Sequence, residues 1–186
     1  VSIIIGIPLG VLAARYRNRP PDIIISSFAI AGLSIPVFVI GTLMVLLFSV
    51  RWQIFPASGY VSFGEDPVEH LKRLGLPAIT LGILSSATIM RMTRSSMLEV
   101  LGDDYVRTAR AKGMHERTVV YGHALRNAMI PVITVVGLQI GTLLGGSVLV
   151  EYIFNWPGLS TYLITGINQR DYPVVQAVML VIAVVF

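Results

Sequence analysis

The stretch that decides the fold class is residues 23–50, IIISSFAIAGLSIPVFVIGTLMVLLFSV, which contain no charged side chain. At 1.5 Å per residue, a helix of this length extends about 42 Å, whereas the hydrocarbon core of a bilayer is about 30 Å thick. We therefore expect a membrane-spanning helix that tilts, protrudes or bends. Pro36 is predicted to kink it, either for packing or to shape a pathway, because proline removes a helical hydrogen bond.

The composition of the whole chain agrees with a membrane protein. Hydrophobic residues make up 54% of the 186 residues and charged residues only 13%, against about 25% charged residues in soluble domains. The absence of cysteine excludes disulfides and thiolate metal sites. The chain begins and ends within apolar runs, so we expect one transmembrane domain over residues 1–186 that is truncated at both termini.

Other apolar runs complete the predicted set of spans: residues 1–14, 76–98, 129–152 and 174 onward. The prediction is an all-α, polytopic transmembrane helical bundle with about five spans in this chain. Residues 51–75 and 153–173 are predicted as aromatic-rich loops, the first with a short surface helix at 67–74.

Polar residues and glycines within these runs carry further predictions. Arg91 and Arg94 share a helix face near one end of their span, where they either reach the membrane interface or line a wet pathway. Glu151, near the end of its span, is either structural or a gating or binding-protein contact. Glycines at spacing four predict a packed helix–helix seam, formed by Gly137, Gly141 and Gly145. Pro131 is expected in the first turn of its helix.

The distribution of basic residues predicts the orientation. Ten of the fourteen Lys and Arg residues lie in the polar segments 15–22 and 91–128. Cytoplasmic loops of membrane proteins carry this excess, so these two segments are predicted to be cytoplasmic and the aromatic-rich loops to lie outside. The formal net charge of +4 is thus explained by loop asymmetry rather than by binding of nucleic acid.

The longest polar segment between spans is residues 103–127, DDYVRTARAKGMHERTVVYGHALRN. Asp103 is a candidate N-cap, and Gly113 can take the left-handed conformation that closes a helix, so a short helix is predicted over 104–112. A second helix follows and leads into the next span. Two helices joined at a glycine form a compact knob that suits docking into a groove on a partner.

An alternative is a basic segment held to anionic lipid headgroups. The acidic residues Asp103, Asp104 and Glu116 argue against it, because they add nothing to lipid binding.

Several motifs carry a family resemblance. The residues Asp104-Tyr-Val-Arg-Thr-Ala-Arg-Ala-Lys-Gly113, followed by His123-Ala-Leu-Arg-Asn-Ala-Met-Ile-Pro131, resemble the signature loop (the EAA loop) of ABC-importer permeases. Four shorter motifs are similar, in the same order, to the dipeptide/oligopeptide/nickel branch of these proteins: Gly32-Leu-Ser-Ile-Pro36, Phe55-Pro-Ala-Ser-Gly59, Trp156-Pro-Gly158 and Arg170-Asp-Tyr-Pro173. The Glu-Ala-Ala positions of the general signature read Arg107-Thr108-Ala109 here, as in that branch, which leaves no role for the signature Glu.

The resemblance implies a permease subunit, not an enzyme, in an ATP-driven importer of short peptides in the cytoplasmic (inner) membrane. It implies several partners: an ABC ATPase that binds the ATP and Mg, a second homologous permease, a periplasmic or lipid-anchored solute-binding protein and membrane lipid. The loop at 103–126 would couple the permease to the ATPase through Asp104, Tyr105, Arg107, Thr108, Ala109, Arg110, Gly113, His123 and Leu125. Ala109 and Gly113 are expected to set its shape, and Arg107 and Arg110 its charge.

The sequence carries no feature of a different energy source. There is no GxxxxGK[ST] motif, and no acidic residue lies in the middle of a predicted span, which argues against a proton-coupled carrier. We expect no catalytic constellation and no metal site, since His70, His115 and His123 lie in predicted loops without ligand spacing. Three alternatives stay open: the same family importing nickel chelate or glutathione, a secondary transporter or channel without an ATPase, and a membrane-anchored scaffold.

Overall fold

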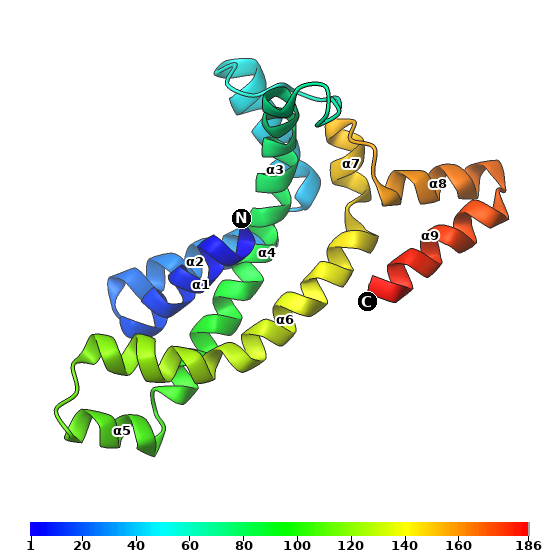
Figure 1. Cartoon of the computed structure of the whole chain (residues 1–186). Coiled ribbons are helices and arrows are strands. Elements are labelled where there is room, and N and C mark those ends of the chain that lie inside the picture. The colour runs from blue at the N-terminus through cyan, green and yellow to red at the C-terminus, as the bar shows by residue number, and fades with distance from the viewer. Residues whose placement is uncertain (186) are drawn as a thin grey trace. The chain divides into compact units, whose positions relative to one another are not determined.

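Helices make up the fold. The computed structural model describes residues 1–143 and 147–185, and of residues 144–146 only the helical backbone. The elements in chain order (Figure 1) are α1 (Ser2–Arg15), α2 (Pro20–Ser34), α3 (Val37–Met44), the π-helix η1 (Val45–Arg51), α4 (Pro67–Val100), α5 (Asp104–Ala111), the π-helix η2 (Thr118–Ala124), α6 (Leu125–Gly146), α7 (Val148–Phe154), α8 (Leu159–Gln169) and α9 (Tyr172–Val185).

Membrane spans can be assigned from length and apolar character. Among the described residues, two helices are long and apolar enough to cross a membrane on their own, Pro67–Val100 and Thr118–Leu143. The helix α2 meets the same criterion only together with α3 and η1, as one span with a break in it. The helices α1 and α9, next to the two ends of the chain, are apolar but shorter. These five segments correspond to the five predicted spans, so the predicted helical bundle class is confirmed.

Two compact units divide the chain. Unit 1 comprises Val1–Ser34 and Ile83–Gly137, and unit 2 comprises Ile35–Gly82 and Leu138–Phe186. The boundary at Ile35 falls where the run 23–50 is interrupted. Pro36 has an extended backbone, with ψ of 142°, between the end of α2 and the start of α3. The predicted kink is therefore a full break in the helix, since Pro36 leaves the helical conformation instead of bending within it.

Unit 1 is held together by a close approach of α1 to α4. A Cβ atom added at Gly10 would lie 2.7 Å from the carbonyl oxygen of Met90, and one at Gly6 would lie 2.9 Å from that of Ser86. Only glycine permits this separation. The two glycines are four residues apart, which is the same spacing that predicted a packed seam in α6. In α1 this spacing lets the helix pack closely against α4.

The predicted glycine seam in α6 has a different outcome. A Cβ atom at Gly137 would meet no atom within 4 Å, so Gly137 makes no close contact with the described residues. Gly141 is buried, and Gly145 lies outside the residues whose surroundings are described. A seam with another chain stays a prediction.

An ion pair joins α2 to α4 in unit 1. Arg94 donates two hydrogen bonds to Asp22, from Nε to Oδ1 at 2.6 Å and from Nη2 to Oδ2 at 2.7 Å. The carboxylate also accepts the backbone N–H of Asn18 and the hydroxyl of Ser26. Arg94 is therefore held in place by Asp22, which is 3% exposed. Whether this pair lies at the membrane interface or beside a wet pathway stays a prediction.

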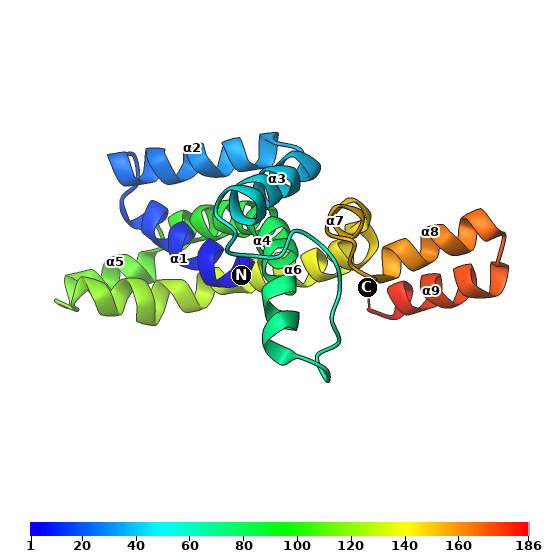
Figure 2. The ribbon, with the colours of Figure 1, turned by 90° about the horizontal axis from the view of Figure 1, so that it is seen from above.

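Unit 2 is organised by α7. Its side chains Val150 and Phe154 pack on Leu76 of α4, with Phe55 and residues of α3 and η1 around them. In Figure 2, α8 and α9 lie side by side as a helical hairpin that follows α7. Asp171 begins α9, since its carboxylate accepts the backbone N–H of Val174.

Three predicted boundaries are wrong. Residues 67–74 are the first turns of α4 rather than a separate surface helix, and residues 153–173 contain α8 rather than only loop. The predicted span 129–152 starts earlier and ends at Gly146, so Pro131 lies inside α6. The pair Gly145-Gly146 has low helix propensity, which favours an end there, and α7 follows as a separate helix.

Glu151 explains how α8 begins where a loop was predicted. The residue is 8% exposed, and its carboxylate accepts hydrogen bonds from the backbone N–H of Thr161 at 2.7 Å, from the hydroxyl of Thr161 at 2.8 Å and from the hydroxyl of Ser147 at 2.6 Å. A weaker bond at 3.4 Å comes from the N–H of Ser160. Helix N-termini favour an anion, so Glu151 caps α8 from the neighbouring helix. This favours the structural alternative for Glu151.

Gly158 makes this capping possible. A Cβ atom at Gly158 would collide with the carboxylate of Glu151. The Trp156-Pro-Gly158 motif thus ends in glycine because the carboxylate fills the space that a side chain needs.

We predict that Gly158→Ala and Glu151→Ala each destabilise the folded chain by about 2 kcal/mol, the effect of losing a helix cap and leaving buried donors unpaired. The double variant should be little worse than either single variant, since both remove the same carboxylate from the same place. Thermal unfolding of the full-length protein in detergent measures this.

Gly137→Ala is the matched control, because its added methyl group would meet no atom of the described residues within 4 Å and should leave the unfolding temperature unchanged or slightly higher. Additive losses in the Gly158→Ala, Glu151→Ala double variant would contradict the capping role.

Candidate functional site

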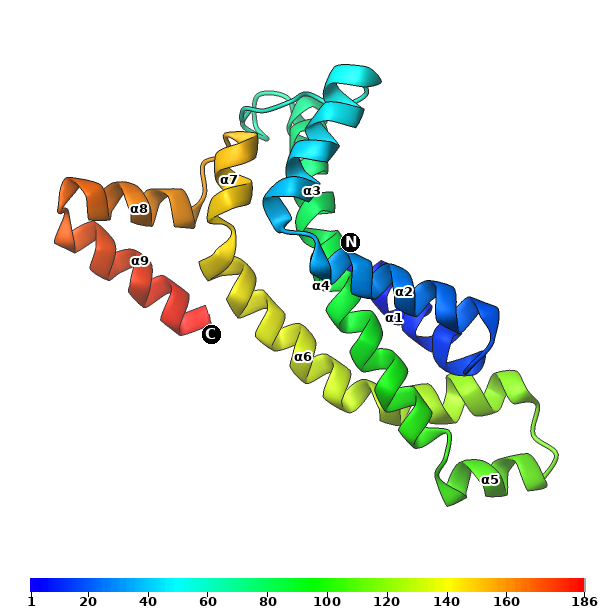
Figure 3. The same ribbon diagram turned by 180° about the vertical axis from the view of Figure 1, so that it is seen from behind.

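The predicted knob at residues 103–126 forms in unit 1. Figure 3 shows α5 lying alongside the helix that follows it, and α5 contacts η2. The predicted helix 104–112 is confirmed to within one residue, since α5 covers Asp104–Ala111. Asp103 is at the N-cap position with an extended backbone, but its side chain makes no capping hydrogen bond. The exposed carboxylate of Asp103 thus stabilises α5 only through its negative charge near the N-terminus of the helix.

Gly113 closes α5 as predicted. Its φ is +75°, and its N–H donates to the carbonyl of Arg110 at 2.9 Å. The N–H of Met114 donates to the carbonyl of Ala109 at 3.3 Å. This pair of bonds is a Schellman motif, which needs a left-handed residue at the position of Gly113. The turn sends the chain back alongside α5.

A small apolar core holds the knob together. Val106 and Val119 are fully buried and Ala109 is 9% exposed, and these three pack together. Val100 and Leu101, where α4 ends, pack against the same cluster. Ala109 therefore sets the shape of the knob from inside, and its small side chain is not presented to a partner.

Two polar contacts cross the knob. The amide Nδ2 of Asn127 donates to the hydroxyl of Tyr105 at 2.8 Å, which ties α5 to α6. The guanidinium of Arg110 bonds Glu116 at 2.9 Å and 3.2 Å. These bonds lower the pKa of the Glu116 carboxyl and raise the pKa of Arg110. Arg110 is thus neutralised within the chain and is a weaker candidate for a charged contact than the sequence predicted.

The remaining face of α5 is open to solvent. Its residues are Asp104, Arg107, Thr108 and Ala111, all exposed. The side chain of Arg107 is 75% exposed and has only a 3.5 Å contact with Asp104. We call these four residues the α5 outer face. This face offers a partner two charged groups, the guanidinium of Arg107 and the carboxylate of Asp104, whose side chain is 97% exposed.

His123 and Leu125 lie apart from the α5 outer face. His123 is exposed on η2, whereas Leu125 packs against a buried cluster that contains Val11 of α1 and Met97 of α4. Leu125 therefore anchors the base of the knob in unit 1.

The aromatic loops meet in unit 2 in a way that the sequence did not reveal. The ring of Trp156 lies edge-on to Tyr60 at 5.1 Å and to His70 at 5.4 Å between centroids. The N–H of Gly59 donates to the carbonyl of Phe154 at 2.9 Å, which brings the Phe55-Pro-Ala-Ser-Gly59 motif against α7. Phe55 itself packs against the buried cluster of Leu76, Val150 and Phe154 in unit 2.

Asp22 was the acid that sequence reasoning missed. It is buried in unit 1 at the start of α2 and carries the ion pair with Arg94. The sequence did contain a signal for this ion pair. Asp22 directly precedes an apolar run, where an acidic residue needs a cationic partner, and Arg91 and Arg94 were the candidates. Among the described residues, no group of three His, Asp or Glu side chains comes together as a metal site.

These observations define a class first. The chain is a multi-pass helical membrane protein with an ordered helical knob between two of its long apolar helices. Over residues 6–186 it matches the family described as the binding-protein-dependent transport system inner membrane component, and it belongs to that family.

Two relatives illustrate the branch. The dipeptide transport system permease protein DppB of Escherichia coli K12 is 48% identical over 202 aligned residues, covering 96% of this chain and 60% of DppB. The glutathione transport system permease protein GsiC of the same strain is 46% identical over 185 residues, covering 100% of this chain and 58% of GsiC. The chain therefore spans about three fifths of the length of both relatives. The resemblance predicted from the loop and turn motifs is confirmed.

We predict that Gly113→Val destabilises the folded chain by about 1–3 kcal/mol, because a branched side chain is strained at a φ of +75°. Gly113→Asn is the matched control, since asparagine tolerates the left-handed region. Amide hydrogen exchange of residues 104–120 in the full-length protein measures the opening of the knob. Equal protection in both variants would show that the Schellman turn does not hold α5 in place.

Proposed function

We propose that this chain is part of the permease subunit of an ATP-driven importer that moves short peptides across the cytoplasmic membrane. A separate ATPase subunit would dock on the loop at 103–126 and supply the energy. Membership of the binding-protein-dependent transport family supports this proposal, as does the dipeptide transport named for DppB.

The observation that carries the proposal is the α5 outer face. The helix α5 has a buried side that packs on its own chain and an opposite side whose residues are exposed. Such a face, ordered by a Schellman turn and two polar contacts, suits insertion into a groove of a partner. A lipid-binding loop needs no such order.

The contacts of the knob suggest how force would be transmitted. Val100 and Leu101 connect its core to α4, and the bond between Tyr105 and Asn127 connects it to α6. Movement of the ATPase against α5 would thus move the adjoining ends of both long helices together. Rigid-body motion of this kind switches access in many transporters.

The partners follow from the same proposal. ATP and Mg would be bound by the ATPase subunit and no cofactor by this chain. A second homologous permease would complete the pathway, and a periplasmic or lipid-anchored solute-binding protein would deliver solute. The predicted orientation puts the aromatic group of Tyr60, His70 and Trp156 on the side that faces this binding protein.

Glutathione is the second candidate solute, because GsiC is named for glutathione transport and is nearly as similar as DppB. A nickel chelate remains a prediction from the resemblance alone. A secondary transporter without an ATPase is the alternative class, and it predicts uptake that does not need ATP.

We predict that Arg107→Glu and Ala111→Trp, both on the α5 outer face, lower ATP-driven uptake of a dipeptide about tenfold or more while membrane insertion is unchanged. A lost interfacial contact of about 1.4 kcal/mol corresponds to a tenfold loss of affinity. The assay uses the full-length protein in vesicles with its ATPase and binding-protein partners.

Arg19→Glu is the matched charge reversal, since Arg19 is an exposed arginine in the other segment predicted to be cytoplasmic. It should keep uptake. Unchanged uptake in both Arg107→Glu and Ala111→Trp would contradict the proposal that the α5 outer face couples the permease to the ATPase. Uptake without ATP would favour a secondary transporter.

A further inference from the structure

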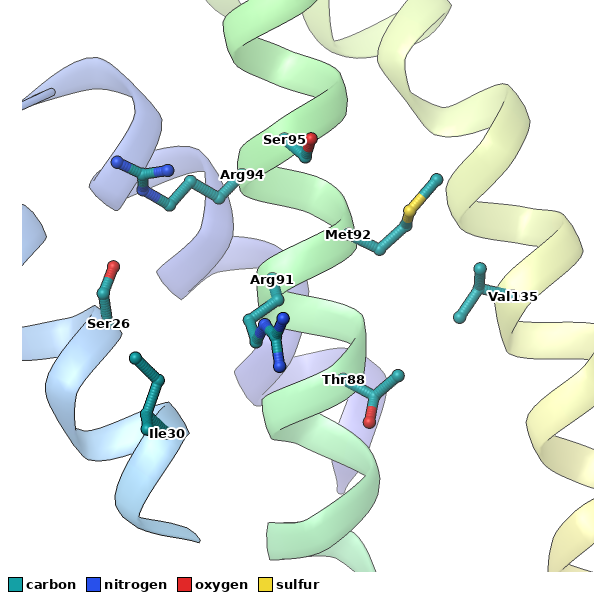
Figure 4. A pocket seen from close by; sticks show the side chains of 8 residues that line it. All are labelled: Ser26, Ile30, Thr88, Arg91, Met92, Arg94, Ser95 and Val135. Carbon is teal, nitrogen blue, oxygen red and sulfur yellow. The ribbon is translucent and has the colours of Figure 1, made fainter. Parts of the chain in front are cut away.

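A cavity of about 590 Å³ opens in unit 1 between α2, α4 and α6. Figure 4 shows side chains from all three helices around it, among them Ser26 and Ile30 of α2, Thr88, Arg91 and Ser95 of α4, and Val135 of α6. Its volume lies within the range of about 300–1,000 Å³ that small-molecule sites occupy.

The cavity has an unbalanced positive charge. Of the two arginines that line it, Arg94 is neutralised by Asp22. Arg91 has no ion pair among the described residues, and no acidic side chain lines the cavity. Arg91 is exposed and lies at the start of the polar segment 91–128, toward the predicted cytoplasmic end of α4. An ionisable residue without a partner in a membrane-spanning helix is a candidate functional site.

The side chain of Arg91 lies along the wall of the cavity. Figure 4 shows its guanidinium beside the turn that carries Thr88, on the N-terminal side of its own backbone position. Side chains on a helix lean toward its N-terminus, and for Arg91 this brings the guanidinium over the turn that carries Thr88.

Hydroxyl groups lie on the same helix face. Thr88 is three residues before Arg91 and Ser95 four residues after it, spacings that place side chains next to one another on a helix. Within the part of the chain that the structure describes, neither hydroxyl has a hydrogen-bond partner, whereas the hydroxyl of Ser26 donates to Asp22. The cavity therefore offers a guanidinium and two free hydroxyl donors on one helix.

We propose that this cavity is an anion subsite on the transport route, in which Arg91 binds the carboxylate of the passing solute and Thr88 and Ser95 donate hydrogen bonds to it. Arginine suits this task because its planar donors match a carboxylate in a bidentate geometry. The inference rests on the proposed transport function. It adds to that function the chemical group of the solute that is bound, the carboxylate, and the residue that binds it, Arg91.

The test compares a dipeptide with its C-terminal amide, which lacks the carboxylate. Uptake of each is measured in vesicles that contain the full-length protein and its ATPase and binding-protein partners. Arg91→Gln should lower uptake of the acid about tenfold relative to the amide, as expected for a lost charge-assisted contact. The binding protein is the same in all samples, so its own preference cancels. Arg91→Lys should restore part of the preference for the acid.

Arg19→Gln is the matched control and should leave the ratio of acid to amide unchanged. An equal loss for both solutes, or no loss for either, would overturn the subsite. If the loss of dipeptide uptake in Arg91→Gln depends on phosphatidylglycerol in the vesicles, Arg91 binds a lipid headgroup, and the proposed anion subsite is overturned as well. Absence of ATP-driven uptake in the wild type would contradict the proposed function itself, separately from the role of Arg91.

Discussion

The carboxylate of Asp22 accepts hydrogen bonds from Arg94, from the backbone of Asn18 and from Ser26, and the arrangement of unit 1 depends on it. An ionised group among apolar helices is tolerated only when it is paired and hydrogen-bonded. Satisfying Asp22 fixes the turn between α1 and α2 and attaches α2 to α4. The same rule operates in unit 2, where the carboxylate of Glu151 is satisfied by the first turn of α8 and by Ser147. Each unit thus contains a buried acid whose hydrogen bonds join two helices, α2 to α4 in unit 1 and α7 to α8 in unit 2.

This arrangement bears on how the knob would act. Arg94 is held by Asp22 six residues before α4 ends at Val100, a distance of about 9 Å along the helix. The core of the knob begins at that end, with Val100 and Leu101 against Val106 and Val119. In the proposed mechanism, α5 is therefore attached to a helix that is already fixed to its neighbour. The cavity with Arg91 lies on the same stretch of α4, so a movement of the knob would reach the proposed solute contact directly.

The sequence predicted the class of the protein, a departure from straight helix at Pro36, the five apolar segments and the short helix closed by Gly113, although it predicted a kink at Pro36 where the structure has a full break. These features rest on local signals, namely uncharged runs, proline and the left-handed preference of glycine. It did not predict α8, because the cap of that helix comes from Glu151 on another helix. It did not predict the seam at Gly6 and Gly10 of α1, because glycine spacing alone does not show which helix packs against α4 at Ser86 and Met90. It assigned Arg110 to a partner, since its bond with Glu116 depends on how the chain turns back at Gly113.

The central claim is that the α5 outer face contacts an ATPase subunit. Residues 1–186 contain no cysteine, so a single introduced cysteine in this region has a defined position. The most direct measurement is cross-linking of Arg107→Cys in the full-length protein, assembled with its ATPase subunits, with Lys72→Cys in the predicted outer loop as the comparison. The account predicts a cross-link to the ATPase from position 107 and none from position 72. A transport-competent assembly in which position 107 forms no such cross-link would contradict it.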